Sequence, residues 1–387
     1  MKKKIAFACL LAVVGLLAVV LLDGWAAFGS KVAGARLARL QASPQWRDGR
    51  VVNPQPLHND LWKMLAGAFH SSPDTSPGVL PLRPPLIEQQ GPAVVATLAT
   101  PPASGLRVTW LGHSTALIEL EGRRFLIDPV WSPRASPLGW VGPRRFFPPP
   151  IALAALPPLD AVVISHDHYD HLDRATVVAL AGRGATFVVP LGVGAHLAGW
   201  GIPEARIIEL DWWQRAPFGP VTVVCTPARH ASGRMLIDND AKLWAGYAFV
   251  GAAHRVYYSG DSGLFPGLRD IGVRLGPFDL TLIEVGQYGQ AWPDWHMGPE
   301  QAVRAHQLVG GRLLLPVHWG AFALAYHAWT EPIERALAAA ARAGVAVVAP
   351  RPGHSFEPAT PPPVDRWWPA LAVKTAEQDP IVSTQTQ

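Results

Sequence analysis

The ten residues from Val162 to His171, which read VVISHDHYDH, constrain the fold of this chain more than any other stretch. The first three are β-branched and predict a short buried strand. Four potential metal ligands follow within six positions, at His166, His168, Asp170 and His171. Because side chains alternate along an extended backbone, three of them can converge on one point while His171 faces a second. The spacing favours a site for two metal ions at a strand end rather than an ordinary polar loop.

Three further candidate ligands repeat this pattern, since His230, Asp261 and His318 each follow a predicted strand. An isolated His or Asp at such a position is more often a turn residue, so the interpretation depends on the whole set. Five His and two Asp form a donor set that suits Zn²⁺, Fe or Mn²⁺. The two cysteines, Cys9 and Cys225, lie in an apolar run and in a predicted strand, so neither completes a zinc–thiolate site.

Composition narrows the class of protein. A chain of 387 residues that is 49% hydrophobic can bury a large core. Its 39 Pro and 36 Gly predict many turns and irregular loops, which suits a sheet-rich enzyme better than a helical bundle. The net charge is +4, but Lys and Arg are scattered and no basic run is interleaved with aromatic residues. We therefore expect no nucleic-acid partner.

The amino terminus predicts a membrane anchor over residues 1–28. Three lysines precede an unbroken apolar run from Ile5 to Leu22, which as a helix would reach roughly 27 Å, close to the roughly 30 Å hydrocarbon core of a bilayer. A cleaved signal peptide is the alternative, but its apolar region is shorter, and no small-x-small cleavage site follows Leu22. We expect an uncleaved single-pass anchor in the inner membrane, with the lysines in the cytoplasm and the remaining chain in the periplasm.

After the anchor, we expect a Pro-rich arm over residues 29–104, a catalytic domain over residues 105–357 and a tail over residues 358–387. Trp46, Trp62 and Phe69 give the arm more aromatic residues than a disordered linker has, so part of it should pack on the domain. Helices are predicted over 173–181, from Pro299 and from Thr330 to Gly344. Alternating runs predict strands over 107–111, 116–120, 124–128, 162–164, 186–190, 206–210, 221–225, 246–250, 255–259, 280–284, 312–317 and 345–349.

The order of the candidate ligands resembles that of the metallo-β-lactamase superfamily, and the resemblance covers roughly Gly105 to Phe356. It implies an α/β (α+β) fold, a four-layer αββα sandwich with the site at the edge of its two sheets. It also implies two divalent metal ions, Zn²⁺ first, with Fe or Mn²⁺ as alternatives. By this resemblance one ion is held by His166, His168 and His230, the other by Asp170, His171 and His318, and Asp261 bridges them.

Within the superfamily the chain is most similar to the N-acyl-phosphatidylethanolamine-hydrolysing phospholipase D family and its bacterial relatives. The resemblance implies a phosphodiesterase that attacks with a hydroxide shared by both ions, since two cations lower the pKa of a bound water from about 15.7 towards about 7. Asp170 could orient this hydroxide. The segments that carry the similarity are Trp110–Ser114, Asp128–Pro137, Gly142–Phe146, Ala228–His230, Gly260–Gly263 and Val317–Gly320.

Two more histidines are candidate catalytic residues. His113 follows a strand in the Gly-His pair of the family and is a support or substrate contact, with a purely structural role equally open. His296 precedes a helix and is a candidate proton donor or substrate contact. The loop from Trp131 to Phe147 combines aromatic residues with arginines, so it could contact acyl chains and a phosphate; alternatively the aromatic residues pack beneath it and the arginines pair with acidic neighbours.

Two other functions remain open from the sequence. The same dinuclear centre could serve a lactonase or another ester hydrolase. A non-enzyme alternative is a membrane-tethered metal-binding module that kept the fold and lost catalysis, although the complete ligand set argues against it. The expected partners are a phospholipid or other small-molecule substrate and the membrane, with a homodimer as a further possible assembly.

Overall fold

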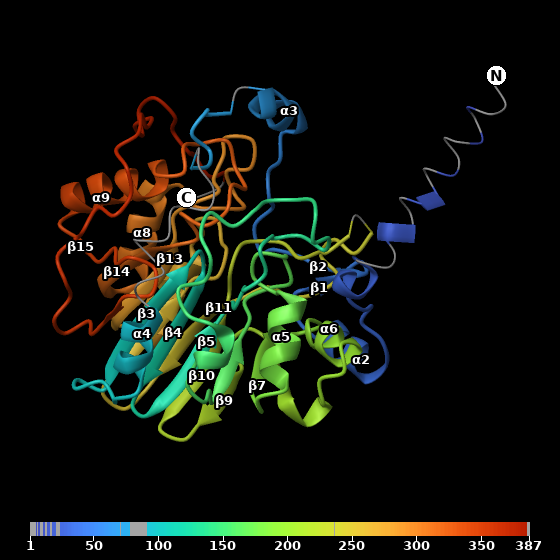
Figure 1. The fold of residues 1–387 in the computed structure, drawn as a ribbon, viewed down its shortest axis with the longest axis horizontal. Coiled ribbons are helices and arrows are strands. Elements are labelled where there is room, and N and C mark those ends of the chain that lie inside the picture. The colour runs from blue at the N-terminus through green and yellow to red at the C-terminus, as the bar shows by residue number, and fades with distance from the viewer. Residues whose placement is uncertain are drawn as a thin grey trace.

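Two seven-stranded sheets packed face to face, with helices on both outer sides, form the computed structural model of this protein (Figure 1). The structure describes residues 5, 7, 11, 14–15, 18–20, 24–69, 71–77, 91–235 and 237–384. This arrangement confirms the predicted four-layer αββα sandwich. The boundaries expected between arm, catalytic domain and tail stay predictions.

The first sheet has the strand order β16-β3-β4-β5-β6-β7-β8. The β3-β4-β5 meander and the β16-β3 pair are antiparallel, and β5 to β8 run parallel. Its strands are β3 (Leu106–Gly112), β4 (Thr115–Leu120), β5 (Arg123–Ile127), β6 (Ala161–Val163), β7 (Thr186–Pro190), β8 (Ile207–Leu210) and β16 (Ser355–Phe356).

The second sheet has the order β15-β14-β13-β12-β11-β10-β9, antiparallel from β9 to β12 and parallel from β12 to β15. Its strands are β9 (Arg215–Phe218), β10 (Val221–Thr226), β11 (Gly246–Val250), β12 (Arg255–Tyr258), β13 (Phe278–Glu284), β14 (Gly311–Val317) and β15 (Ala346–Val347).

Helices cover the outer faces. The first sheet carries α4 (Gly91–Leu98), α5 (Arg174–Ala181) and α6 (Gly194–Gly199), and the second carries α7 (Gly267–Leu275), α8 (Pro299–Val309) and α9 (Glu331–Ala343). Two short 3₁₀ turns are η3 (Leu153–Ala155) and η4 (Glu204–Arg206). The predicted helix over 173–181 corresponds to α5, with Asp173 at its N-cap. The carboxylate of Asp173 accepts from the Ser132 main-chain N–H rather than from the helix amides.

Alternation along the strands decides which core each residue joins. In β6, Ala161 and Val163 face the core between the sheets, whereas Val162 faces the core beneath α4 and α5. Leu117 and Leu126 likewise face outward, between residues that face the inner core. Both faces of this sheet are buried, which explains why its central parallel strands β6 (AVV) and β7 (TFVVP) are almost entirely apolar.

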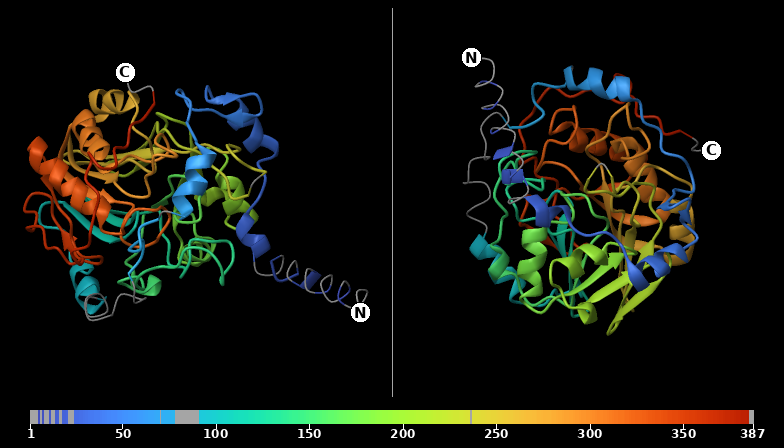
Figure 2. Two further views of the ribbon diagram at one scale, coloured as in Figure 1. Left: turned by 90° about the horizontal axis from the view of Figure 1, so that it is seen from above. Right: turned by 90° about the vertical axis from the view of Figure 1, so that its right-hand side faces the viewer.

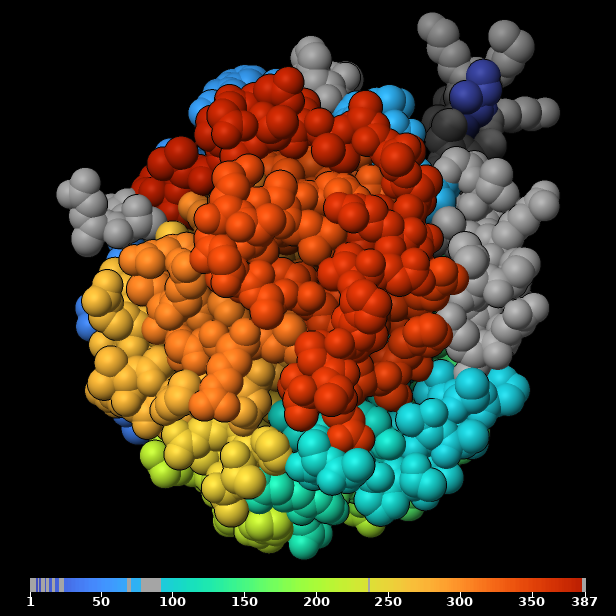
Figure 3. Space-filling view, turned by 90° about the vertical axis from the view of Figure 1, so that its left-hand side faces the viewer, coloured from blue at the N-terminus to red at the C-terminus, as the bar shows by residue number. Residues whose placement is uncertain are grey.

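The arm and the tail run over the sandwich (Figures 1 and 2). The arm contains the helix α2 (Gly34–Gln41), the hairpin of β1 (Trp46–Arg47) and β2 (Arg50–Val51), and the helix α3 (Leu61–Phe69). In Figure 1, α2 lies beside α6, and α3 lies at the top of the view. The tail lies over α9, where Glu334 accepts from the side chains of Arg366 and Trp368. Figure 3 shows the carboxyl-terminal part of the chain covering this face.

The predicted transmembrane helix needs correction. In the part of the chain that the structure describes, no helix combines the length and the apolar character needed to cross a bilayer. Of the predicted span over 5–22, residues 6, 8–10, 12–13, 16–17 and 21–22 lie outside the described residues. The predicted membrane anchor is therefore not supported, nor is the single-pass inner-membrane location that depended on it.

Candidate metal centre

All seven predicted ligands lie just beyond the carboxyl ends of strands. The segment from His166 to His171 follows β6, His230 follows β10, Asp261 follows β12 and His318 follows β14. Since β12, β13 and β14 are parallel, their carboxyl ends share one edge of the second sheet, and the β6 end of the first sheet meets them there. The structure thus brings together residues up to 152 positions apart, as between His166 and His318. Their role as metal ligands stays a prediction.

Three imidazoles form one half of the cluster, which we call the imidazole group: His166, His168 and His230. The Nε2 atom of His166 lies 2.9 Å from Nδ1 of His168, and Nε2 of His230 lies 3.3 Å from that same Nδ1. With Asp261, these residues offer four ligand atoms within 4.8 Å of one another. They could hold one metal ion.

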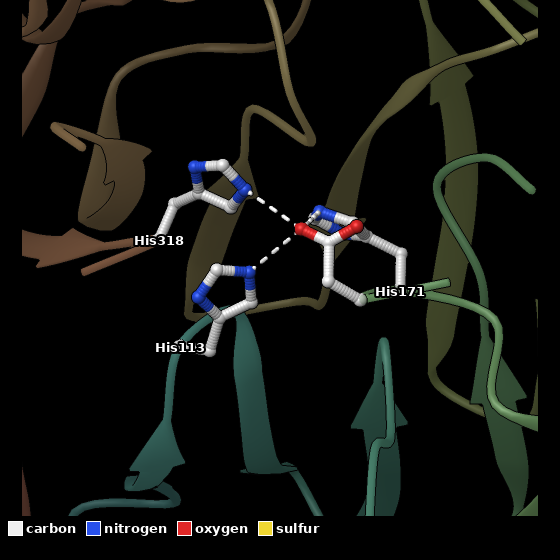
Figure 4. A group of neighbouring side chains, drawn as sticks. His113, His171 and His318 are labelled. Atoms are coloured by element: carbon white, nitrogen blue, oxygen red, sulfur yellow. Dashed lines mark hydrogen bonds and ion pairs between the residues drawn. The ribbon is translucent and has the colours of Figure 1, made fainter. Parts of the chain in front are cut away.

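The other half, the carboxylate group, consists of Asp170, His171, His318 and His113. Figure 4 shows its three histidines pointing toward one another. Oδ2 of Asp170 accepts a hydrogen bond from Nε2 of His113 at 2.9 Å and lies 3.3 Å from Nε2 of both His171 and His318. His113 therefore stands inside the cluster, where the resemblance alone had left its role open.

Asp261 lies between the two groups. Its Oδ2 atom is 3.1 Å from Nε2 of His171 and of His318 in the carboxylate group, and 3.8 Å from Nε2 of His166 and of His230 in the imidazole group. One oxygen thus faces both possible metal positions, which is the geometry expected of a bridging carboxylate.

Several residues of the cluster have strained backbones. His113, Asp128 and His318 have φ angles of 53°, 37° and 64°, in the left-handed region that residues other than glycine rarely adopt. Gly260, with φ of 59°, turns the chain into Asp261, and a Cβ there would stand 2.5 Å from the Ala245 carbonyl oxygen. Such strain persists where the surrounding structure overrides it, and it concentrates at functional sites.

The three histidines of the imidazole group have lowered pKa values, which favour their neutral form. Burial, reinforced by the neighbouring imidazoles, holds the pKa of His166 well below its usual value, and burial does the same for His230 although Asp261 opposes it. Burial also lowers the pKa of His168. Neutral imidazoles keep a nitrogen lone pair free, which is the form that binds a metal ion.

The carboxylate group attracts positive charge instead. Burial acts to lower the pKa of His171, but Asp261, Asp170 and Asp128 outweigh it and hold that pKa well above its usual value. In the same way burial is outweighed at His318, where Asp261 and Asp170 raise the pKa to about 10. The carboxylates of Asp261, which is buried, and of Asp170, which lies at the pocket, therefore favour positive charge in this half of the cluster.

A buried carboxylate, Asp128, orients His171. Nδ1 of His171 donates to Oδ2 of Asp128 at 2.7 Å, so that Nε2 faces the cluster. Asp128 is itself held by the main-chain N–H and hydroxyl of Ser165 and by the hydroxyl of Tyr258. A carboxylate behind a histidine is a common partner of metal-binding imidazoles.

A second supporting carboxylate, Glu284, was not predicted from the sequence. It ends β13 fully buried, accepts from Nδ1 of His296 at 2.8 Å, and lies 3.6 Å from Nδ1 of His318. His296 thus stands beside the cluster, with Nδ1 3.8 Å from Oδ2 of Asp261. The signal that could have found Glu284 is its position at the end of a buried strand, which it shares with the predicted ligands.

The donor set fits divalent metal ions. Nε2 of His171 and Oδ1 of Asp261 are buried and have no hydrogen-bond partner, although both belong to the cluster. Buried polar atoms without partners are rare, and a cation bound between them would satisfy both. Nitrogen and carboxylate oxygen donors without thiolate suit Zn²⁺, Fe or Mn²⁺.

A pocket of about 320 Å³ opens directly onto the cluster. His168, Asp170, Asp261, His296 and His318 line its floor. Its walls are mainly apolar and aromatic, with the amides Asn59 and Gln287 among them. Two wall residues, Asn59 and Met64, come from the arm, outside the predicted catalytic domain. The other wall residues are Gln287, Trp292, Trp295, Leu324 and Tyr326.

The loop from Trp131 to Phe147 does not form this wall. Phe146 and Phe147 are each 1% exposed and pack in the hydrophobic core, where their rings contact those of Trp329 and Trp367. Arg145 is also buried, donates to the carbonyl of Val130 and lies over the Phe322 ring. These residues support the fold, so the prediction that they contact acyl chains and phosphate is wrong for them.

Residues 123–319 match a family described as the beta-lactamase superfamily domain. An uncharacterized protein of Mycobacterium tuberculosis is 51% identical over 357 residues, which cover 89% of this chain and 92% of the relative. The N-acyl-phosphatidylethanolamine-hydrolyzing phospholipase D 1 of Caenorhabditis elegans is 41% identical over 231 residues, or 57% of this chain and 65% of that protein.

Among solved structures, a metallo hydrolase from the archaeon Ignicoccus hospitalis superposes with a TM-score of 0.51. The match covers 65% of this chain and 98% of that protein at 24% sequence identity. At this level of identity the likeness extends to the fold alone, and it agrees with the two-sheet sandwich described above.

Proposed function

We propose that this chain, which belongs to the beta-lactamase superfamily and is a metal-dependent hydrolase, is a phospholipase D-type phosphodiesterase that acts on N-acyl-phosphatidylethanolamine-like lipids. The observation that carries the proposal is a pocket with apolar walls that ends on two adjoining clusters of metal-ligand side chains. The relative from C. elegans, which carries that activity in its name, supports the choice of substrate.

The proposed ligands are the imidazole group for one ion, Asp170, His171 and His318 for the other, and Asp261 between them. Two bound divalent cations would supply an activated water and a Lewis-acid contact for a substrate oxygen. Such a centre needs no serine or cysteine nucleophile. Asp128 and Glu284 behind the histidines would fix their ring orientations.

The reaction breaks one bond and forms another. Oxygen of a water adds to the phosphorus, and the bond between phosphorus and the head-group oxygen breaks, which yields a phosphomonoester and an alcohol. We assign Asp170 to hold and orient the attacking water, because it lines the pocket. We assign His296 to give a proton to the leaving oxygen, since Glu284 occupies its Nδ1 and leaves the other ring nitrogen for transfer.

The walls of the pocket favour a substrate with an acyl chain. Met64, Trp292, Trp295, Leu324 and Tyr326 offer apolar contact within reach of the cluster. A volume of about 320 Å³ accommodates the polar linkage and only the adjoining part of a lipid chain. The remainder of a lipid would extend past the arm residues at the mouth.

The test is a substrate panel with the purified full-length chain and metal analysis on the same sample. We expect about two metal ions per chain and hydrolysis of N-acyl-phosphatidylethanolamine in mixed micelles. The Asp170→Asn variant, purified in parallel, is the matched control for contaminating hydrolases.

Efficient hydrolysis of short lactones, with N-acylated and plain phosphatidylethanolamine left intact, would replace the phospholipase by the lactonase alternative. Bound metal without turnover of any phosphodiester, lactone or thioester would favour a metal-binding module.

A further inference from the structure

We infer that Asn53 of the arm and Thr384 of the tail are positioning residues for the metal centre, because they hold the two loop segments that carry His230 and His296. Both lie outside the 105–357 range that the sequence assigns to catalysis. The inference rests on the proposed metal centre for its consequence, but its contacts are independent of any ion.

Asn53 pairs with the main chain of His230 in both directions. Its Nδ2 donates to the His230 carbonyl oxygen at 2.6 Å, and its Oδ1 accepts from the His230 N–H at 3.1 Å. A single arm side chain thus replaces the strand neighbour that this residue lacks beyond the end of β10. His230 is fully buried, so few alternative partners for these groups are at hand.

The ring of His230 is held through the next segment. Its Nδ1 donates to the main-chain carbonyl of Trp295 at 2.9 Å, which leaves Nε2 for the imidazole group. The orientation of His230 therefore depends on how the segment from Asp294 to His296 lies against it.

A buried ion pair joins these two segments at their bases. Nη1 of Arg229, the residue before His230, lies 2.9 Å from Oδ1 of Asp294, and the two side chains are 1% and 0% exposed. Thr384 closes the pair from the tail: its N–H donates to Oδ1 of Asp294, its hydroxyl donates to Oδ2, and its carbonyl accepts from Nη1 of Arg229.

The arm meets the same ion pair. Nη2 of Arg229 donates to the carbonyl of Pro56, and the N–H of His58 donates to Oδ2 of Asp294. Two stretches of chain more than 320 positions apart, around Asn53 and Thr384, therefore close over one buried charge pair. Fixed in this way, His230 and His296 cannot shift independently of each other.

The experiment uses full-length Asn53→Ala, with divalent metal affinity measured by competition with a chelator. We expect the affinity for Zn²⁺ at the position held by the imidazole group to fall about 10-fold, in the range typical of residues that orient ligands. As a readout that needs no metal, amide hydrogen exchange of metal-free protein should show faster exchange at His230.

Two further sets of variants separate positioning from general stability. Arg39→Ala removes another contact of the arm with the domain, since Arg39 donates to the Glu209 carbonyl and to Gln214 away from the cluster. It should lower thermal stability without changing metal affinity. In the tail, Thr384→Val should weaken metal binding, and Thr384→Ser, which keeps the hydroxyl, should restore it.

Unchanged metal affinity and unchanged His230 exchange in Asn53→Ala, or an equal loss of affinity in Arg39→Ala, would overturn the inference. Wild-type protein that binds no divalent metal would instead refute the proposed centre. In that case hydrogen exchange is the only test of the positioning role. Faster exchange at His230 in Asn53→Ala supports that role, and unchanged exchange rejects it. If Asn53→Ala does not fold, the Thr384→Val and Thr384→Ser pair gives the same decision.

Discussion

The imidazole group and the carboxylate group adjoin one another, yet they are built on different physical principles. In the imidazole group, burial keeps the rings neutral, and His230 is held by main-chain and amide partners. At the carboxylate group, Asp170 and the shared Asp261 favour positive charge, and the buried carboxylates Asp128 and Glu284 lie behind His171 and His318. Two neighbouring candidate metal positions can therefore differ in charge even when both are rich in histidine.

The largest effect should come from Asp261→Ala, because it removes the one residue that both groups share. Oδ2 of Asp261 faces two imidazoles of each group. We expect metal binding to weaken in both positions and kcat/KM to fall by about 10⁴-fold, or about 5 kcal/mol in transition-state free energy. Metal analysis with a phosphodiester assay checks this. Retention of two tightly bound ions would show that Asp261 does not connect the groups.

Asp170→Asn and His171→Ala should separate the groups by emptying only the carboxylate half. We expect one metal ion to remain per chain, turnover to fall by about 10³-fold, and the fold to persist, since its two-sheet core does not depend on the metal. Metal stoichiometry and circular dichroism are the measurements. His168→Ala is the matched variant from the imidazole group, and wild-type turnover at unchanged metal content in either carboxylate-group variant would contradict the ligand assignment.

His296→Gln tests a residue that stands beside the carboxylate group without being a proposed ligand. Loss of a proton donor should lower kcat by about 10²-fold, within the range typical of general acid catalysis, with both metal ions retained. Because a good leaving group needs no protonation, turnover of p-nitrophenyl phosphodiesters should fall much less than turnover of lipid phosphodiesters. Equal losses on both substrate types would argue against proton transfer by His296.

The smallest effect should come from Asp128→Asn, which weakens the support of His171 without removing a ligand. An amide in place of the carboxylate keeps the shape but loses the charge behind the ring. We expect metal affinity in the carboxylate group to fall by about 10-fold. Chelator competition would show the effect in one position only, and an equal loss in both positions would mean that the two groups are not independently supported.

Strands were predictable because alternation is local. The predicted strand 221–225 corresponds to β10 over Val221–Thr226, and the prediction over 186–190 coincides with β7. Helix α7 was not predicted, since it contains Gly272, a poor helix former. In the fold Gly272 allows close packing against α8, where a Cβ would stand 2.4 Å from the carbonyl oxygen of Leu308. A local sequence pattern cannot predict that contact.

Supporting residues were harder to predict than candidate ligands. Glu284 and Asp128 are ordinary carboxylates in the sequence, and only burial beside His296 and His171 reveals what they do. Phe146 and Phe147 stand next to arginines in the sequence, which suggested a lipid contact, yet they pack inward. In each case the direction of a side chain depended on neighbours far along the chain.

The sequence alone predicted most strands of the sandwich, though not β9 or β16, and the seven residues that gather at its edge. Both kinds of prediction depend on patterns that extend over only a few residues. The tertiary structure decided which of these residues share a group, that His113 joins the carboxylate group, and that Asn53 and Thr384 reach the segments beside it. The packing of the two sheets, the arm and the tail sets the distances between these residues. A local sequence pattern contains no information about that packing.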